Sequence, residues 1–399
     1  MINNLLIKRM TLPNGIRLVQ FPRSQKLTAQ LSVFIHFGSK IGSENNSGIA
    51  HYLEHMVGGG SEGRIDATHS IEQNGCYLDL STDLEFTHGF VDVFPEKLDE
   101  TSTVVSKLFF EHDFEEKKFD LEKKVILDEI AEYLDDPWVV ADDMLRKSLY
   151  KIHPIRHPIL GYPETVNQFS FDEIIEAKQT NYTPQNTILV LSGNYSDKNL
   201  ESVVQTFGEI KTSTIPPKKY TYVKEAESKK TSIVNNQGKS QTYLGCGYRT
   251  VFGNHPDNPA IELFSAIMGT GESSRLFREL REKRALAYSI QSSTCNGEDF
   301  GFFSIQCAVK SSRIKKATNL ILKEITKLKT KKVSDKELSK VKNILVGDFL
   351  RGIDSSFTLQ TQLARLEILF ADESAIQKYL AKVKSVSVDD LIEVANKYL

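Results

Sequence analysis

Two stretches of the chain follow the same plan, one in each half. Residues 28–59 read TAQLSVFIHFGSKIGSENNSGIAHYLEHMVGG, and residues 240–269 read SQTYLGCGYRTVFGNHPDNPAIELFSAIMG. Each has an alternating strand pattern, a polar loop that contains glycine, and then an apolar helical pattern. Such a repeat predicts an internal duplication: an α+β fold with two homologous domains, each made of a sheet and helices. A length of 399 residues also suits two to three domains.

The boundary between the halves is predicted from composition. Residues 209–232 are polar, rich in lysine and carry the pair Pro216–Pro217, so they resemble a linker. We therefore predict an N-terminal domain at 1–210, a linker at 211–230 and a C-terminal domain at 231–399.

Several elements are predicted within the first half. Strands are expected around an Asn-Gly turn in 11–22 and in 29–40, 76–94 and 187–194, because apolar residues alternate or form short buried runs there. Helices are expected at 48–60, from about Ser70, and over about 97–150 with a break at 135–137.

Composition and charge argue against several kinds of partner. The formal net charge is -2, so nothing favours nucleic acid or an anionic membrane surface. No signal peptide, transit peptide or membrane-spanning run is recognisable. The four cysteines form no C-x-x-C pair, which is typical of a reducing compartment. We therefore predict a soluble, cytoplasmic protein with no nucleic-acid or membrane partner.

The helix predicted at 48–60 carries chemistry as well as apolar residues. At roughly 100° per residue, His55 lies about 40° from His51 and Glu54 about 60° to its other side, so the three share a face. The opposite face is apolar, with Ile49, Leu53 and Met56. Imidazoles at i and i+4 can bind one metal ion, and Glu54 is placed as a general base for a metal-activated water. The H-x-x-E-H order is the inverzincin signature.

The pattern alone leaves an alternative open, because a surface helix can hold two histidines and a glutamate without any metal. Catalytic zinc needs a third protein ligand. Glu122 and Glu129 are seven residues apart beside an apolar stripe, so they lie along one side of a helix. The rise between them is about 10 Å, so one would be the ligand and the other a supporting acid. Alternatively, both belong to a solvated helix rich in Lys and Glu.

These residues resemble a known family, the inverzincin metallopeptidases of the pitrilysin, insulysin and mitochondrial-processing-peptidase type. That family follows H-x-x-E-H with an E-x6-E pair whose second glutamate binds zinc. Here Glu129 lies 74 residues after His55 and seven after Glu122. The resemblance continues through "IEQNGCYLDLSTDLEFT", "HPILGYPETVNQFSFDEI" and "NYTPQNTILVLSGN", and so covers essentially the whole chain. The resemblance implies that His51, His55 and Glu129 bind Zn²⁺, and that Glu122 is a supporting acid that does not bind the ion itself.

The second half is similar to a further signature of the family in "GTGESSRLFRELREKRALAYSIQS". The resemblance implies that Arg281 and Tyr288 reach the substrate, where a guanidinium or a phenol can hydrogen-bond the peptide backbone or the developing oxyanion. Arg281 could instead pair with Glu279 or Glu282. Without the family, this segment is a charged helix facing solvent.

The chain has the length of the family's short form, whose members work as dimers. In the family two such chains form a clam-shell chamber, each chain half of it, and the zinc site of one half faces the Arg/Tyr signature of the other. Because this chain carries both signatures, the resemblance implies a homodimer acting on peptide substrates. A heterodimer with a related chain is the alternative.

The chain departs from the family in two places. It has VGGGSEGRI where a Phe-x-Gly-Thr segment is common, and Asp79 where an asparagine is frequent. The strand that holds Asp79 is expected to bind substrate backbone by strand addition, and an ionised aspartate can only accept hydrogen bonds there.

Two functions remain in competition. One is a zinc metalloendopeptidase acting on peptides or unfolded segments. The other is a catalytically silent or partner-dependent subunit of a heterodimer, serving in substrate binding or assembly. Silent members typically lose a ligand or the base, whereas His51, Glu54, His55 and Glu129 are all present here. A metal-dependent hydrolase of another substrate class is a third possibility, which the second-half signature argues against.

Overall fold

The computed structural model describes residues 7–110, 114–212, 222–225, 232–237 and 240–399. The chain forms two compact units. Unit 1 contains residues 1–132, 157–221 and 353–374, and unit 2 contains residues 133–156, 222–352 and 375–399. Each unit combines a sheet with helices, which confirms the predicted α+β class with two domains.

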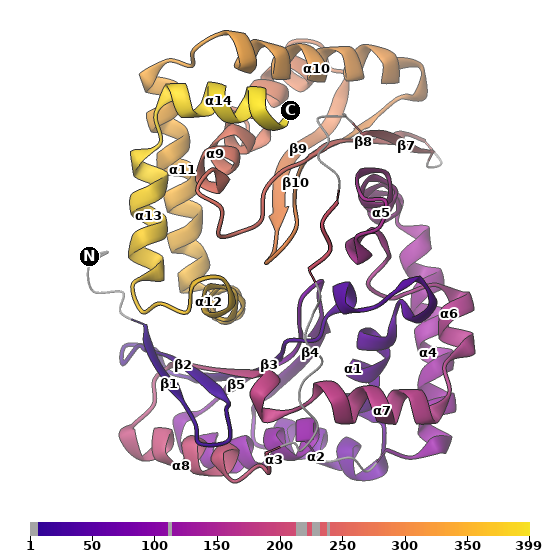
Figure 1. Ribbon diagram of the computed structural model, residues 1–399, viewed down its shortest axis with the longest axis vertical. Helices are drawn as coiled ribbons and strands as arrows, with labels where there is room; N and C mark the ends of the chain where they lie inside the picture. Colours follow the sequence, from indigo (N-terminus) through magenta and orange to yellow (C-terminus); the bar gives the residue numbers. More distant parts are fainter. Residues whose placement is uncertain (1–6, 111–113, 213–221, 226–231, 238–239) are drawn as a thin grey trace. The chain divides into compact units, whose positions relative to one another are not determined.

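Unit 1 is built on a six-stranded sheet (Figure 1). The spatial order of its strands is β1 (Lys8–Thr11), β2 (Arg17–Pro22), β6 (Thr187–Gly193), β3 (Ala29–Ile35), β5 (Thr87–Val93) and β4 (Tyr77–Thr82). Only the β2–β6 pair is parallel. The strand β4 is therefore an edge strand of this sheet, with one side of its backbone outside the ladder.

The helices of unit 1 follow the predicted regions with one difference in extent. They are α1 (Ile49–Gly59), α2 (Glu62–Gln73), α3 (Leu98–Phe110), most of α4 (Glu116–Asp135), α6 (Pro163–Gln168), α7 (Phe171–Asn181), α8 (Asp197–Gly208) and α12 (Ser356–Phe370). The prediction of a helix only from about Ser70 is wrong, because α2 begins at Glu62. Its N-cap Ser61 accepts a hydrogen bond from the Arg64 backbone N–H and so fixes the start of the helix. Only a short turn therefore separates α2 from the glycines at the end of α1.

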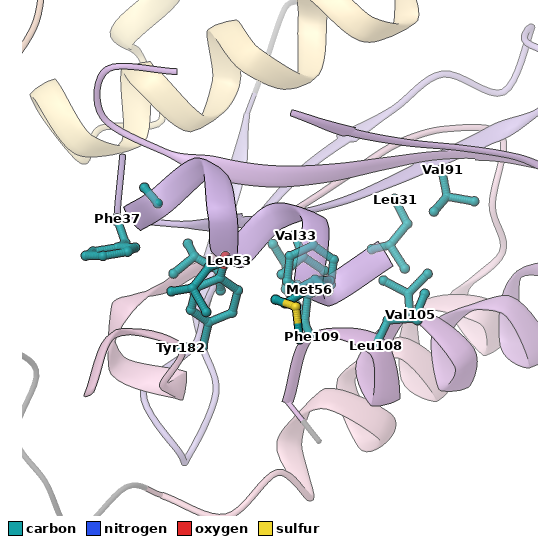
Figure 2. Close-up of a cluster of buried hydrophobic side chains, with 14 of the residues drawn as sticks. Leu31, Val33, Phe37, Leu53, Met56, Val91, Val105, Leu108, Phe109 and Tyr182 are labelled. Atoms are coloured by element: carbon teal, nitrogen blue, oxygen red, sulfur yellow. The ribbon is translucent and has the colours of Figure 1, made fainter. Parts of the chain in front are cut away.

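The core of unit 1 lies between the sheet and α1 (Figure 2). Alternate residues of β3, including Leu31 and Val33, turn one face toward the helix, and Leu53 and Met56 of α1 pack against that face. Phe109 of α3 and Tyr182 complete the cluster. Burial on this side fixes the rotation of α1, and with it the direction of the remaining side chains.

Unit 2 is built on a four-stranded antiparallel sheet in the order β7 (Ser232–Gln237), β8 (Thr242–Arg249), β10 (Gly301–Val309) and β9 (Ala287–Asn296). Its other elements are α5 (Pro137–Leu149), α9 (Asn258–Gly269), the π-helical segment η7 (Phe277–Glu282), α10 (Ile314–Thr330), most of α11 (Asp335–Asp354), α13 (Ala375–Ser385) and α14 (Val388–Tyr398). The predicted break after α4 is present, since α4 ends at Asp135 and α5 begins at Pro137.

The order of elements in the two halves of the chain supports the internal duplication. The first half runs β2–β3–α1–α2–β4–β5–α3–α4–α5, and the second runs β7–β8–α9–η7–β9–β10–α10–α11–α12. In both sheets the three strands β3–β5–β4 and β8–β10–β9 have the same antiparallel order. The repeat inferred from the sequence therefore has a counterpart in the topology.

The units do not coincide with the two halves of the chain: α5, from the first half, belongs to unit 2, and α12, from the second half, belongs to unit 1. Helix α5 packs against β7 and β8, and α12 packs against β6, β3, β2 and β5. Hydrogen bonds of Gln360 with Ser192 (2.6 Å) and of Arg9 with Glu367 (2.7 Å) hold α12 in place. The predicted continuous domains therefore differ from the units by these segments. An amphipathic pattern shows which face of a helix is buried but not which sheet that face packs against. Most of the predicted linker lies outside the described residues.

None of the helices in the described part of the chain combines the length and the apolar composition that crossing a membrane requires.

Candidate metal centre and active site

The helix α1 presents both histidines because close backbone contacts and core packing hold it. Its N-cap Gly48 has φ 97°, and a Cβ there would lie 2.6 Å from the Leu160 carbonyl oxygen. Leu53 and Met56 are fully buried below the helix. On the opposite side the rings of His51 and His55 lie edge to face, with centroids 4.7 Å apart. His51 is only 5% exposed, so α1 is covered on more of its circumference than a simple amphipathic pattern predicts.

The helix α4 brings the carboxylates to these histidines. Ile126 and Ile130 anchor it in the core of unit 1. The Tyr52 ring stacks on Phe119 at 5.0 Å, and the Tyr52 hydroxyl donates to the Phe119 carbonyl at 2.7 Å. These contacts fix α4 against α1.

Three donor atoms converge between α1 and α4. The Oε2 atom of Glu129 lies 3.4 Å from Nε2 of His51 and 3.2 Å from Nε2 of His55. One donor atom from each residue lies within 4.8 Å of the others, and within the described residues this is the one group of three or more His, Cys, Asp or Glu side chains able to hold a metal ion. Two imidazoles and a carboxylate are a ligand set that suits zinc.

Glu122 lies behind the cluster. Its Oε2 atom is 3.1 Å from Nδ1 of His55, the ring nitrogen that faces away from Glu129. Gly59, at the end of α1, makes room for this carboxylate, because a Cβ at that position would lie 2.4 Å from Oε1 of Glu122. Because the two glutamates are separated along α4, Glu129 lies between the two histidines. Glu122 contacts only the far side of the His55 ring.

The pKa values of the three side chains in the cluster depart from their ordinary values. Burial, with the nearby His55, lowers the pKa of His51 to about 4. Burial opposes protonation of His55 too, but its hydrogen bonds to Glu122 and Glu129 outweigh that effect and raise its pKa to about 9. The hydrogen bond with His55 lowers the pKa of Glu129. The donor atoms of His51, His55 and Glu129 lie close enough together to hold a divalent cation, and two imidazoles and a carboxylate fit such a cation.

Glu54 lies next to the cluster on α1 and is partly buried. Burial raises the pKa of Glu54, and the nearby Thr82 side chain acts in the opposite direction. Thr82 ends β4, so the edge strand contacts the predicted base. The sequence reasoning missed this contact, although the threonines in LSTDLEFT end one strand and begin the next.

Asp79 lies on the same edge strand, opposite Phe90 of β5. It is partly buried, and its charge acts on both Glu54 and His88. The strand therefore runs beside the predicted metal centre.

Arg281 and Tyr288 belong to unit 2, on η7 and at the start of β9. The guanidinium carbon of Arg281 lies 5.2 Å from the Tyr288 ring centroid, so the two predicted residues contact each other. Tyr288 is 75% exposed. Glu279 pairs with Lys283 and Arg284, and Glu282 lies 4.0 Å from Arg278. Neither acid pairs with Arg281 among the described residues.

Fold and cluster together define a class: two-domain α+β proteins with a His–His–Glu group of the kind found in metallopeptidases. The chain belongs to peptidase family M16. Residues 18–162 match the family model described as "Insulinase (Peptidase family M16)", and residues 168–345 match the one described as "Peptidase M16 inactive domain".

Individual relatives span nearly the whole chain. A Bacillus subtilis protein named "uncharacterized zinc protease" is 26% identical over 96% of this chain and 93% of its own length. A probable beta subunit of the mitochondrial-processing peptidase from Arabidopsis thaliana is 23% identical over 98% of this chain and 75% of its own. The crystal structure of a protease from Helicobacter pylori has a TM-score of 0.89 at 23% identity, covering 98% and 96% of the two chains, and confirms the fold.

Proposed function

We propose that the chain is a zinc metalloendopeptidase that hydrolyses peptides or unfolded protein segments. The observation that carries this proposal is the convergence of His51, His55 and Glu129 at one point, with Glu54 beside them. Membership of a peptidase family and the name "zinc protease" of the Bacillus relative support it.

His51, His55 and Glu129 would hold Zn²⁺. When bound, the ion supplies Lewis-acid polarisation of the peptide carbonyl and makes a water more acidic. Three protein ligands leave coordination positions for substrate and water, the arrangement of catalytic rather than structural zinc. Glu122 would hold His55 in the tautomer whose Nε2 faces the metal.

Glu54 would act as the general base. It takes the proton from the attacking water and later delivers that proton to the leaving amine, so one carboxylate serves both steps. Burial, which raises its pKa, brings that group closer to the neutral range in which a base is useful.

The edge strand β4 would bind the substrate. An extended peptide can add to the unpaired side of β4 through backbone hydrogen bonds, and Asp79 on this strand would contact it. Because an ionised aspartate accepts but does not donate, it favours substrate groups that carry N–H donors.

Arg281 and Tyr288 would contact the substrate from a second chain. In the proposed homodimer, the metal centre of one copy and the Arg/Tyr pair of the other form one site. A heterodimer with a related chain is the alternative for the partner. The proposed location is cytoplasmic, because the four cysteines form no C-x-x-C pair.

The competing proposal is a silent subunit that serves binding or assembly. The presence of both histidines, Glu129 and the base beside them favours an active enzyme, because a silent subunit has no need to keep these four groups together.

One experiment separates these two functions. Purified protein loaded with zinc is incubated with a mixed peptide library, and cleavage products are mapped by mass spectrometry. The Glu54→Gln variant should keep its zinc and lose hydrolysis by a factor of about 100 or more. Cleavage by this variant at the parent rate would contradict the role of Glu54, and an inert zinc-loaded parent protein would support the silent subunit.

A further inference from the structure

We infer that Phe277 is a positioning residue, whose ring holds the Arg281 guanidinium in place for the substrate. This inference rests on the proposed function, because Arg281 and Tyr288 are the substrate contacts of that proposal. It assigns a role to an aromatic residue that neither the sequence pattern nor the relatives' names identify.

Two aromatic rings contact the Arg281 guanidinium. Its central carbon lies 4.9 Å from the ring centroid of Phe277 and 5.2 Å from that of Tyr288. A cation within about 6 Å of a ring centroid is attracted by the negative face of the ring. Phe277 is partly buried and packs against the core of unit 2, whereas Arg281 and Tyr288 are exposed. Phe277 is therefore the anchored member of the three.

The backbone brings the three side chains together. Phe277 begins η7, and Arg281 follows four residues later, so the two side chains are neighbours on one helical turn. The chain then turns at Ala285, which has φ 47°, and the Ala285 N–H donates to the Arg281 carbonyl oxygen at 3.0 Å. This turn leads into β9 and returns Tyr288 to the side of Arg281. A π-helical turn such as η7 is frequent at functional sites.

The charges around Arg281 are arranged so that no acid competes for it. Every other lysine and arginine in residues 275–284 has a carboxylate partner. The pairs are Arg275 with Glu337, Arg278 with Glu282, and both Lys283 and Arg284 with Glu279. Within the described residues, the Arg281 guanidinium contacts two rings and no carboxylate.

This arrangement suits a residue that must bind a substrate. Stacking on a ring uses the flat face of a guanidinium, whereas its five N–H donors point outward in the plane of the group. The rings can therefore hold Arg281 without occupying the donors that a peptide carbonyl would accept. Because Phe277 limits the conformations of a long side chain before the substrate arrives, less freedom is lost on binding.

The first test compares two substitutions of Phe277. Phe277→Leu keeps an apolar side chain but removes the ring, and Phe277→Tyr keeps the ring. In the zinc-loaded protein, Phe277→Leu should lower kcat/KM for peptide cleavage about twofold to fivefold, the size of an exposed cation–π contact, at unchanged zinc content. Phe277→Tyr should cleave like the parent. Phe252→Leu, which removes a half-exposed ring elsewhere in unit 2, is the matched control and should also cleave like the parent.

A double variant separates positioning from a general structural effect. Arg281→Gln should lower kcat/KM by itself, and adding Phe277→Leu to it should cause no further loss, because Phe277 acts through Arg281. Losses that multiply in the double variant would overturn the inference, as would a tyrosine variant as defective as the leucine variant.

Crystal structures provide a readout that does not depend on activity. The Arg281 guanidinium should keep its place beside Tyr288 in the parent and in Phe277→Tyr, and leave it in Phe277→Leu. An unmoved guanidinium in Phe277→Leu would overturn the inference. If the zinc-loaded parent hydrolyses no peptide, the proposed function fails, and the crystallographic comparison still decides whether Phe277 holds Arg281.

Discussion

The Nδ1 atom of His55 lies 3.1 Å from the Oε2 atom of Glu122, whereas the Nδ1 atom of His51 is buried with no hydrogen-bond partner among the described residues. The two histidines are therefore not equivalent. On the Nδ1 side, Glu122 holds the His55 ring, whereas only packing holds the His51 ring there. Loss of Glu122 should consequently act through His55.

Replacing Glu122 with Gln should weaken zinc binding by about tenfold to a hundredfold, because an amide holds the His55 ring less strongly than a carboxylate does. Competition with a chromogenic chelator measures this affinity. Glu132→Gln, at an exposed position of the same helix, is the matched control and should bind zinc like the parent. Equal affinities of the Glu122 variant and the parent would show that packing alone orients His55.

A methyl group at Gly59 should have a similar effect without touching any ligand. The Cβ of Gly59→Ala would lie 2.4 Å from Oε1 of Glu122 and must displace that carboxylate from His55. The neighbouring Gly58→Ala meets only a methyl group of Leu80, at 3.1 Å, and serves as the control. Alanine favours a helix over glycine by up to about 1 kcal/mol, so neither variant should unfold. We expect lower zinc affinity for Gly59→Ala alone, and a loss in both variants would point to a general effect on α1.

Removing the carboxylate between the histidines should abolish stable metal binding. Glu129→Ala leaves two imidazoles, too few for a tight site, while the exposed neighbour Asp128→Ala removes the same charge and keeps the ligands. Atomic emission after gel filtration should find about one zinc per chain in the parent and in Asp128→Ala, and almost none in Glu129→Ala. Full zinc content in Glu129→Ala would require another third ligand.

Helical periodicity explains why the order of the site was predictable from the sequence. The positions of His51, His55, Glu122 and Glu129 on their helices depend on local geometry, and spacing is enough to describe it. Which glutamate would meet both histidines was inferred from the family and not from spacing. The structure brings Glu129 to that position because Ile126 and Ile130 hold α4 in the core.

Other features depend on contacts that local patterns do not contain. To predict that α5 belongs to unit 2 and α12 to unit 1, one must know which sheet each apolar helix face packs against. The contact of Glu54 with Thr82 depends on the register of β4 and β5, and the start of α2 depends on the cap at Ser61. Hydrophobic patterning specifies burial, whereas these features arise from tertiary packing.

His88 should make unit 1 sensitive to acid. Its ring stacks on Phe34 at 4.7 Å, is 4% exposed, and neither ring nitrogen has a hydrogen-bond partner in the described structure. Burial lowers the pKa of His88 to about 4, although the charge of Asp79 acts in the opposite direction. Below pH 6.5 the unfolded chain therefore binds a proton that the folded chain excludes, and stability falls as the pH approaches 4.

Replacing His88 with Phe should remove this part of the acid sensitivity, because the ring remains and the titratable nitrogens are lost. Between pH 7.5 and pH 5, the parent should lose about 2 kcal/mol more of its free energy of unfolding than His88→Phe does. Urea unfolding of both proteins in chelator at the two pH values measures this, since the contribution of His51 then cancels. His69→Gln, at an exposed histidine of α2, should behave like the parent. Equal losses in the parent and in His88→Phe would mean that the His88 imidazole is protonated in the folded protein as readily as in the unfolded chain.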